Sequence, residues 1–83
     1  MNEPSTSRDL IAVIGAHWRE LLGVEAPRPG DDFIALGGNS MVATMLANRI
    51  EDELGVRPEV IDLFTTLGQT AALCEALLRE AAP

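Results

Sequence analysis

The sequence predicts a single all-α domain, and three observations support this prediction. Apolar residues recur at three- and four-residue steps over three long stretches, as they do on one face of a helix. No window alternates apolar and polar residues as a half-buried strand does. A chain of 83 residues has room for one compact domain. We expect a four-helix bundle over residues 7–81, with a long loop between helices one and two and a short third helix, preceded by a flexible tail of residues 1–6.

The first helix is expected over residues 7–22. Ser7 suits the N-cap position, and the helix dipole favours the acidic Asp9 in the first turn. Gly23 can take the left-handed conformation that ends a helix, and Pro27 keeps the next segment from being helical. The apolar stripe of this helix consists of Leu10, Ile11, Ile14, Trp18, Leu21 and Leu22.

The loop that follows runs to Asn39 and is longer than most connections, which is typical of a functional segment. It is also partly apolar. We expect at least Phe33 and Leu36 to reach the core and hold the loop down. Gly37 and Gly38 then allow a tight turn in which the backbone approaches its neighbours closely.

The second helix is expected over residues 40–54, where Gly55 supplies the stop. Residues 51–53 form an acidic run near the C-terminus of this helix, where the helix dipole disfavours acids. We expect this run to face solvent. The buried stripe of this helix is predicted to be Ala43, Leu46, Ala47, Ile50 and Leu54.

A short third helix is expected within residues 58–64 and a fourth over residues 67–81. Thr66 and Gln69 fit a capping box, in which each side chain satisfies a free backbone N–H of the other residue. Ordinary burial preferences place Trp18 and Cys74 in the core and His17 on the surface.

Composition and charge exclude several classes of function. Six Arg, no Lys and thirteen acidic residues give a net charge of −7, which repels nucleic acids and anionic membranes. A single Cys cannot close an internal disulfide, and one His, one Cys and scattered carboxylates do not make a zinc site. No apolar run is long enough to cross a bilayer, and residues 1–9 are polar, without the apolar core that a signal peptide has. We therefore expect a cytoplasmic monomer without a bound metal.

The residues that suggest chemistry lie at the start of the second helix. Ser40 follows two glycines, at a position where unpaired backbone N–H groups and the helix dipole favour an anion. A nucleophile elbow is excluded because Val42 stands where glycine is required and the only histidine, His17, lies upstream. A P-loop is excluded because lysine is absent. A serine at this place is also a common N-cap, so capping alone stays an alternative.

Residues 36–40, Leu-Gly-Gly-Asn-Ser, resemble the attachment motif of the peptidyl carrier proteins (thiolation domains) of nonribosomal peptide synthetases, in the acyl-carrier-protein-like superfamily. Residues 18–23, 31–33 and 62–64 are similar to further segments of that family, in the same order. The chain departs from the family at residues 67–68, Leu-Gly in place of the usual Pro-Thr, and at Ala35, where an acidic residue is common.

The resemblance implies that Ser40 receives 4′-phosphopantetheine from coenzyme A in a magnesium-dependent reaction run by a separate phosphopantetheinyl transferase. Gly37, Gly38 and Asn39 would complete the cofactor-binding motif. The arm would hold an aminoacyl or peptidyl group as a thioester, in nonribosomal peptide or related natural-product biosynthesis such as that of antibiotics. The implied partners are an adenylation enzyme and condensation, tailoring or thioesterase enzymes. The chain itself would be non-catalytic, and its initiator-like Met1 favours a freestanding protein.

Two alternatives stay open: an acyl carrier protein of a polyketide or hybrid pathway, and a helical interaction module without a prosthetic group. Fatty-acid-type acyl carriers resemble one another in bearing acids along the first half of the second helix and an Asp-Ser-Leu motif, and this chain has neither. This difference favours a peptidyl carrier.

The outward side of the second helix is expected to dock partner enzymes. Exposed methionines are typical of adaptable apolar docking patches. The alternative is that Met45 belongs to the core. If the predicted stripe is buried, the residues left facing outward near the arm are Met41, Thr44, Met45 and Asn48.

Overall fold

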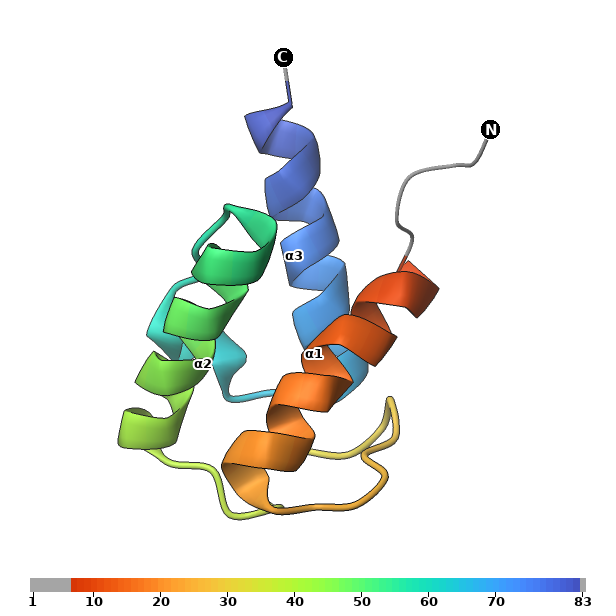
Figure 1. Cartoon of the computed structure of the whole chain (residues 1–83), viewed down its shortest axis with the longest axis vertical. Helices are drawn as coiled ribbons and strands as arrows, with labels where there is room; N and C mark the ends of the chain where they lie inside the picture. The colour runs from red at the N-terminus through yellow and green to blue at the C-terminus, as the bar shows by residue number, and fades with distance from the viewer. Residues whose placement is uncertain (1–6, 83) are drawn as a thin grey trace.

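The computed structural model describes residues 7–82, with side chains from residue 9 onward, and Figure 1 shows their helical arrangement. This part of the chain forms three α-helices, α1 (Ser7–Leu22), α2 (Ser40–Leu54) and α3 (Leu67–Ala81), and one 3₁₀ helix, η1 (Val60–Leu63). The predicted tail, residues 1–6, lies outside the described residues. None of the helices described is long and apolar enough to span a membrane.

The prediction of an all-α domain is confirmed, but the count of four α-helices is not. The predicted third helix is the single 3₁₀ turn η1. Glu59, the residue before Val60, has an extended backbone (φ −69°, ψ 139°), so the turn begins at Val60. Phe64 already has a non-helical backbone (φ −84°, ψ 69°), which ends the turn after four residues.

One hydrophobic core fills the space between the helices, and α1 packs against both α2 and α3. The predicted stripe of α2 is confirmed, with Leu54 only partly buried, and Trp18 and Cys74 are buried as expected. Among the residues whose side chains the structure describes, the buried hydrophobic core consists of Leu10, Ile14, Trp18, Phe33, Ala43, Leu46, Ala47, Ile50, Leu63, Leu67, Ala71 and Cys74.

The helix ends follow the expected capping chemistry in most cases. Gly23 and Gly55 adopt left-handed φ values of 71° and 79°, and their N–H groups donate to Arg19 and Glu51 carbonyls. Ser7 is the first residue of α1 rather than its cap, and the position before it lies outside the described residues.

The start of α3 departs from the predicted capping box. Thr66 Oγ1 accepts from the Gln69 backbone N–H at 3.1 Å, as predicted. The Gln69 side chain meets the Thr65 hydroxyl instead of the Thr66 backbone, so only one half of the box forms.

Two side-chain pairs join α1 to α2. Glu20 of α1 pairs with Arg49 of α2, and the pKa of Glu20 is lowered by that hydrogen bond and by the arginine's charge. His17 Nε2 lies 2.6 Å from Glu53 Oε1. His17 lies at the surface as predicted, but its side chain is only 18% exposed because it is paired with Glu53 of α2.

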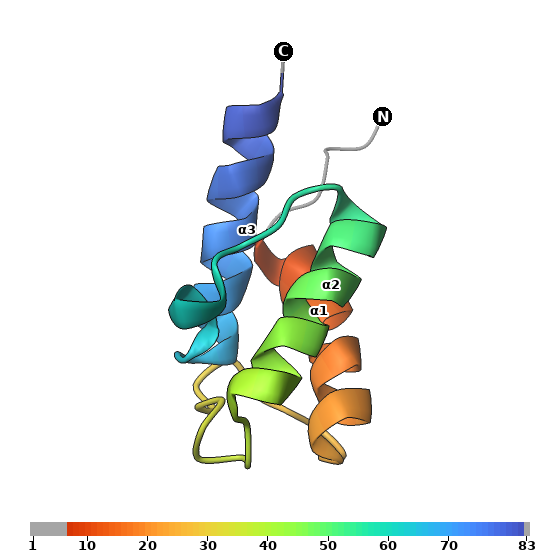
Figure 2. The same cartoon turned by 90° about the vertical axis from the view of Figure 1, so that its left-hand side faces the viewer.

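The long loop is fastened to the start of α3, below which it runs in Figure 2. The Leu67 N–H donates to the Asp31 carbonyl at 3.0 Å, and the Gly68 N–H donates to the Pro29 carbonyl at 2.9 Å. A proline at position 67 could not make the first of these bonds. Leu67, which stands where the family usually has proline, therefore allows this hydrogen bond between the loop and α3.

Candidate functional site

Ser40 is the first residue of α2, and its exposed side chain is not used to cap the helix. The cap is Asn39, whose backbone is extended and whose Oδ1 accepts from the Val42 N–H at 2.9 Å. The alternative that Ser40 serves only as an N-cap is therefore wrong. No hydrogen-bond partner of the Ser40 hydroxyl occurs among the residues that the structure describes.

The loop before Ser40 closes as a compact turn. Asp32 Oδ2 accepts from the N–H groups of Ile34 and Ala35, each at 3.1 Å. The Gly38 N–H donates to the Phe33 carbonyl at 2.9 Å. These bonds satisfy the backbone of the turn internally, as an Asp at the head of a turn commonly does.

The two glycines of the motif are needed for different reasons. Gly37 has a φ of +102°, which other residues rarely adopt. Gly38 has no such angle, but a Cβ there would lie 2.8 Å from Cγ of the buried Phe33 ring. The predicted tight turn with a close backbone approach is thus confirmed. Leu36 is partly buried against the core, as expected.

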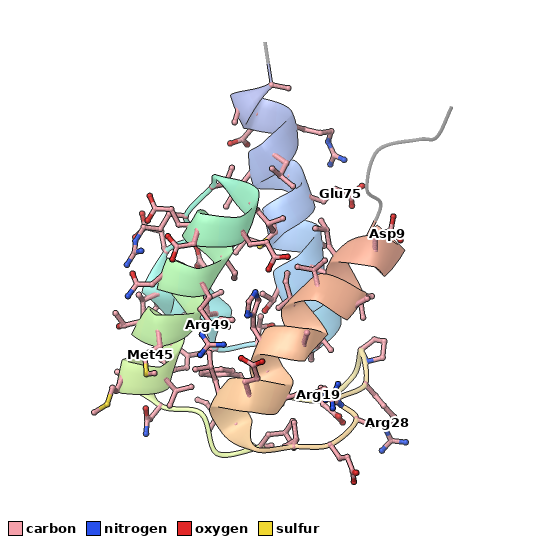
Figure 3. All side chains as sticks on the ribbon, in the orientation of Figure 1. Asp9, Arg19, Arg28, Met45, Arg49 and Glu75 are labelled. Atoms are coloured by element: carbon pink, nitrogen blue, oxygen red, sulfur yellow. The ribbon has the colours of Figure 1, made fainter. Side chains whose placement is uncertain are left out.

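The predicted outward residues of α2 are all exposed. Met41 is 71% exposed and Met45 is 42% exposed, so the alternative that Met45 belongs to the core is wrong. Figure 3 shows Met45 on the side of α2 that faces away from α1 and α3. Two of the four already have polar partners: the Thr44 hydroxyl donates to the Ser40 carbonyl at 2.9 Å, and Asn48 Oδ1 accepts from an arginine.

Two exposed apolar residues of this region were missed by the sequence reasoning. Ile61 of η1 is 74% exposed and Ile34 of the loop is 58% exposed. Each lies in a short apolar run, where periodicity does not decide which side chains face inward.

The chain segment that contains Ser40 is uncharged. Residues 33–48 contain no charged side chain, although the chain carries a net charge of −7. The acidic run at residues 51–53 is exposed as predicted, but it lies at the far end of α2. No group of three or more metal-ligating side chains occurs within the described residues. The only thiol, Cys74, is buried in α3, and burial raises its pKa to about 11.

Comparison with known proteins places this geometry in a family. Residues 12–77 match the family model described as phosphopantetheine attachment site. The chain is 41% identical over 51 residues to the phosphinothricin tripeptide synthetase PhsC of Streptomyces viridochromogenes. The matched region makes up 61% of this chain and 5% of that protein. It is 42% identical over 65 residues to the PF 1022-synthetase of Rosellinia sp., and this matched region makes up 77% of this chain and 2% of that protein. The chain thus spans a small part of these curated relatives.

A solved structure agrees with the sequence comparisons. BlmI, a type-II acyl-carrier protein from Streptomyces verticillus involved in bleomycin biosynthesis, is 34% identical, with a TM-score of 0.80. The match covers 87% of this chain and 89% of BlmI. An exposed serine at a helix start, in this fold and with this family match, leads to one conclusion. The chain belongs to the phosphopantetheine attachment family and is a carrier-protein domain that bears this prosthetic group covalently.

Proposed function

We propose that Ser40 is the residue to which the phosphopantetheine group is attached. The observation that carries this proposal is the exposed Ser40 hydroxyl at the first position of α2, left free because Asn39 caps the helix. Gly37 and Gly38 shape the turn that leads to it. When bound, the group supplies a flexible arm whose terminal thiol carries an acyl group as a thioester.

The chain is a substrate and a carrier rather than a catalyst in this proposal. An unactivated serine hydroxyl is a weak nucleophile and needs a general base to remove its proton. Residues 33–48 offer no acidic or basic side chain for this task, and His17 is engaged with Glu53 at the opposite end of α2. A separate phosphopantetheinyl transferase therefore supplies the base, while the N-terminus of α2 favours the phosphate that becomes attached.

The cargo is proposed to be an aminoacyl or peptidyl group. PhsC, one of the relatives named above, is a tripeptide synthetase, which supports loading by an adenylation enzyme and use by condensation, tailoring or thioesterase enzymes. The alternative is an acyl cargo of a polyketide or hybrid pathway, and it is favoured by the likeness to BlmI, which is described as an acyl-carrier protein. A cytoplasmic location stays a prediction, and it fits a modification that consumes coenzyme A.

The outward side of α2 is proposed as the docking patch for these enzymes, formed by Met41, Thr44, Met45 and Asn48. The two methionines offer flexible apolar surface near the arm, and no charge in residues 33–48 opposes the approach of an apolar partner. The arm increases the effective concentration of its cargo at a docked active site.

Mass spectrometry tests the role of Ser40. The intact protein is incubated with coenzyme A, magnesium and a permissive transferase, and its mass should increase by one 4′-phosphopantetheine group. Ser40→Ala should abolish the increase. Thr44→Ala is the matched control, because it removes an exposed hydroxyl one turn further along the same helix. An increase that persists in Ser40→Ala would refute the assignment.

Loading and docking need separate measurements. The holo protein should accept amino acids from an adenylation enzyme, and acceptance of malonyl or fatty acyl groups alone would select the acyl alternative. Met41→Asp should slow partner reactions while the circular dichroism spectrum stays helical. Ala72→Asp, at an exposed position of α3, is the control for the added charge. Equal rates for both variants would contradict the docking patch.

A further inference from the structure

We propose that Phe33 is a positioning residue for Ser40. Its buried ring supports the Gly38 backbone and so determines where the next two residues present the Ser40 hydroxyl. This inference rests on the proposed role of Ser40 as the attachment residue. It concerns a residue that never touches the phosphopantetheine group and acts only through the loop.

Gly38 lies directly on the ring of Phe33. The three atoms nearest to a Cβ placed at residue 38 all belong to that ring: Cγ at 2.8 Å and two ring-edge carbons that are closer still. Phe33 is fully buried, so its ring cannot move outward to make space. The contact fixes the backbone at Gly38, and one residue, Asn39, separates it from Ser40.

The ring is itself held by two other elements. Trp18 of α1 meets it edge to face at a centroid distance of 5.5 Å, and Phe64 meets it in the same way at 5.9 Å. The Phe33 backbone N–H also donates to the Thr65 carbonyl at 3.0 Å. The core therefore determines the position of the Phe33 ring, and the ring in turn determines the position of the Gly38 backbone.

Phe33 also contacts Gly38 through its backbone. The Phe33 carbonyl accepts from the Gly38 N–H, so the ring and the glycine are linked by a hydrogen bond as well as by packing. Asp32 stabilises the intervening turn through the N–H groups of Ile34 and Ala35. Together these contacts connect the exposed Ser40 to the core by a short, rigid path.

This rigidity matters because group transfer depends strongly on geometry. A displacement of about 1 Å in a reacting group can lower a rate about a hundredfold. The transferase active site requires the Ser40 hydroxyl at a defined position relative to the rest of the domain. A loop free to sink into the core would present that hydroxyl in many positions.

The matched variants are Phe33→Leu and Phe64→Leu. Both replace a ring of the same aromatic cluster with leucine, but only the Phe33 ring supplies the atoms nearest to Gly38. With both variants folded, kcat/KM for transfer from coenzyme A should fall about tenfold or more in Phe33→Leu. It should fall clearly less in Phe64→Leu, which leaves the Phe33 ring against Gly38 and removes only one of its supports. A purely structural role would lower the unfolding midpoint of both without separating their rates.

A second measurement does not depend on the transferase. The backbone amides of Gly38 and Ser40 should become more mobile in Phe33→Leu, with lower NMR order parameters, and should change less in Phe64→Leu. If Phe33→Leu does not fold, Phe33→Met, which keeps more of the side-chain length, takes its place.

The outcomes separate this inference from the proposed function. A wild-type protein that is never modified would count against Ser40 as the attachment residue, and the amide order parameters would still test the role of Phe33. Wild-type rates and unchanged Gly38 and Ser40 order parameters in Phe33→Leu would overturn the positioning role alone.

Discussion

The cap of α2 offers a direct test of how Ser40 is kept available. Asn39→Ala removes the bond from the Val42 N–H to Asn39 Oδ1, which is 2.9 Å long, and leaves one N–H of the first turn without its protein partner. Asn39 is exposed, so water replaces part of that bond. Losses of this kind destabilise a protein by about 1 kcal/mol. For a domain of this size, that amounts to a fall in Tm of about 4–8 °C.

The assay is urea denaturation followed by far-UV circular dichroism, with thermal unfolding as a second measurement. Asn39→Asp keeps the accepting oxygen and adds a negative charge, which the N-terminus of α2 favours, so its stability should match or exceed that of the wild type. Asn48→Ala makes the same change on the same helix, where the amide oxygen only receives an exposed bond from Arg57. Its cost should be smaller than that of Asn39→Ala.

Two results would refute this reasoning. One is an Asn39→Ala protein that unfolds at the same urea concentration as the wild type. The other is an Asn39→Asp protein that is as unstable as Asn39→Ala, because the effect would then not come from the lost acceptor. Either result would mean that the first turn of α2 is held by something other than Asn39.

Three further predictions follow from the core and from the titrating groups. Leu46→Ala should lower the free energy of unfolding by about 2–5 kcal/mol, because the side chain is fully buried, whereas Met45→Ala should change it little; urea denaturation of both checks this. The pKa of Cys74 is raised to about 11 in the folded protein from 9.0, so the unfolded state loses its proton first and stability should fall between pH 9 and 11 by up to about 2 kcal/mol. That fall should be missing in Cys74→Ala, and equal alkaline profiles would contradict it. The pKa of Glu20 is lowered from 4.5 by Arg49, so its contribution to stability is present above pH 4.5 and lost as the pH falls further. Glu20→Gln should flatten this part of the acid profile, measured as the midpoint of thermal unfolding against pH.

The α-helices could be predicted from the sequence because their ends carry local signals. Gly23 and Gly55 end their helices through a backbone angle that needs no distant contact, and Thr66 caps α3 with its own hydroxyl. The third element was harder to predict. Its run of apolar residues is too short to show a period, and its length is set by the extended backbone at Glu59 and the non-helical backbone at Phe64, which no local sequence signal indicates.

Features that depend on distant contacts could not be predicted. His17 and Glu53 are 36 residues apart, and only the packing of α1 on α2 brings them together. The position of Ser40 was predictable from its motif, but sequence alone does not decide whether Asn39 or Ser40 caps the helix, because both are favoured caps. The contact between Gly38 and Phe33 was equally hidden, since it depends on how the loop folds over the core.

The two sides of α2 carry different constraints, and this separates the stability of the domain from its function. On the inner side, Ala43 and Ala47 let α2 approach the core closely, so a larger side chain at either position would strain the packing. On the outer side, Met41 and Met45 contribute little to the core, and exposed positions of this kind usually tolerate substitution within about 0.5 kcal/mol. A loss of partner reactions on changing the outer side is therefore attributable to docking rather than to unfolding.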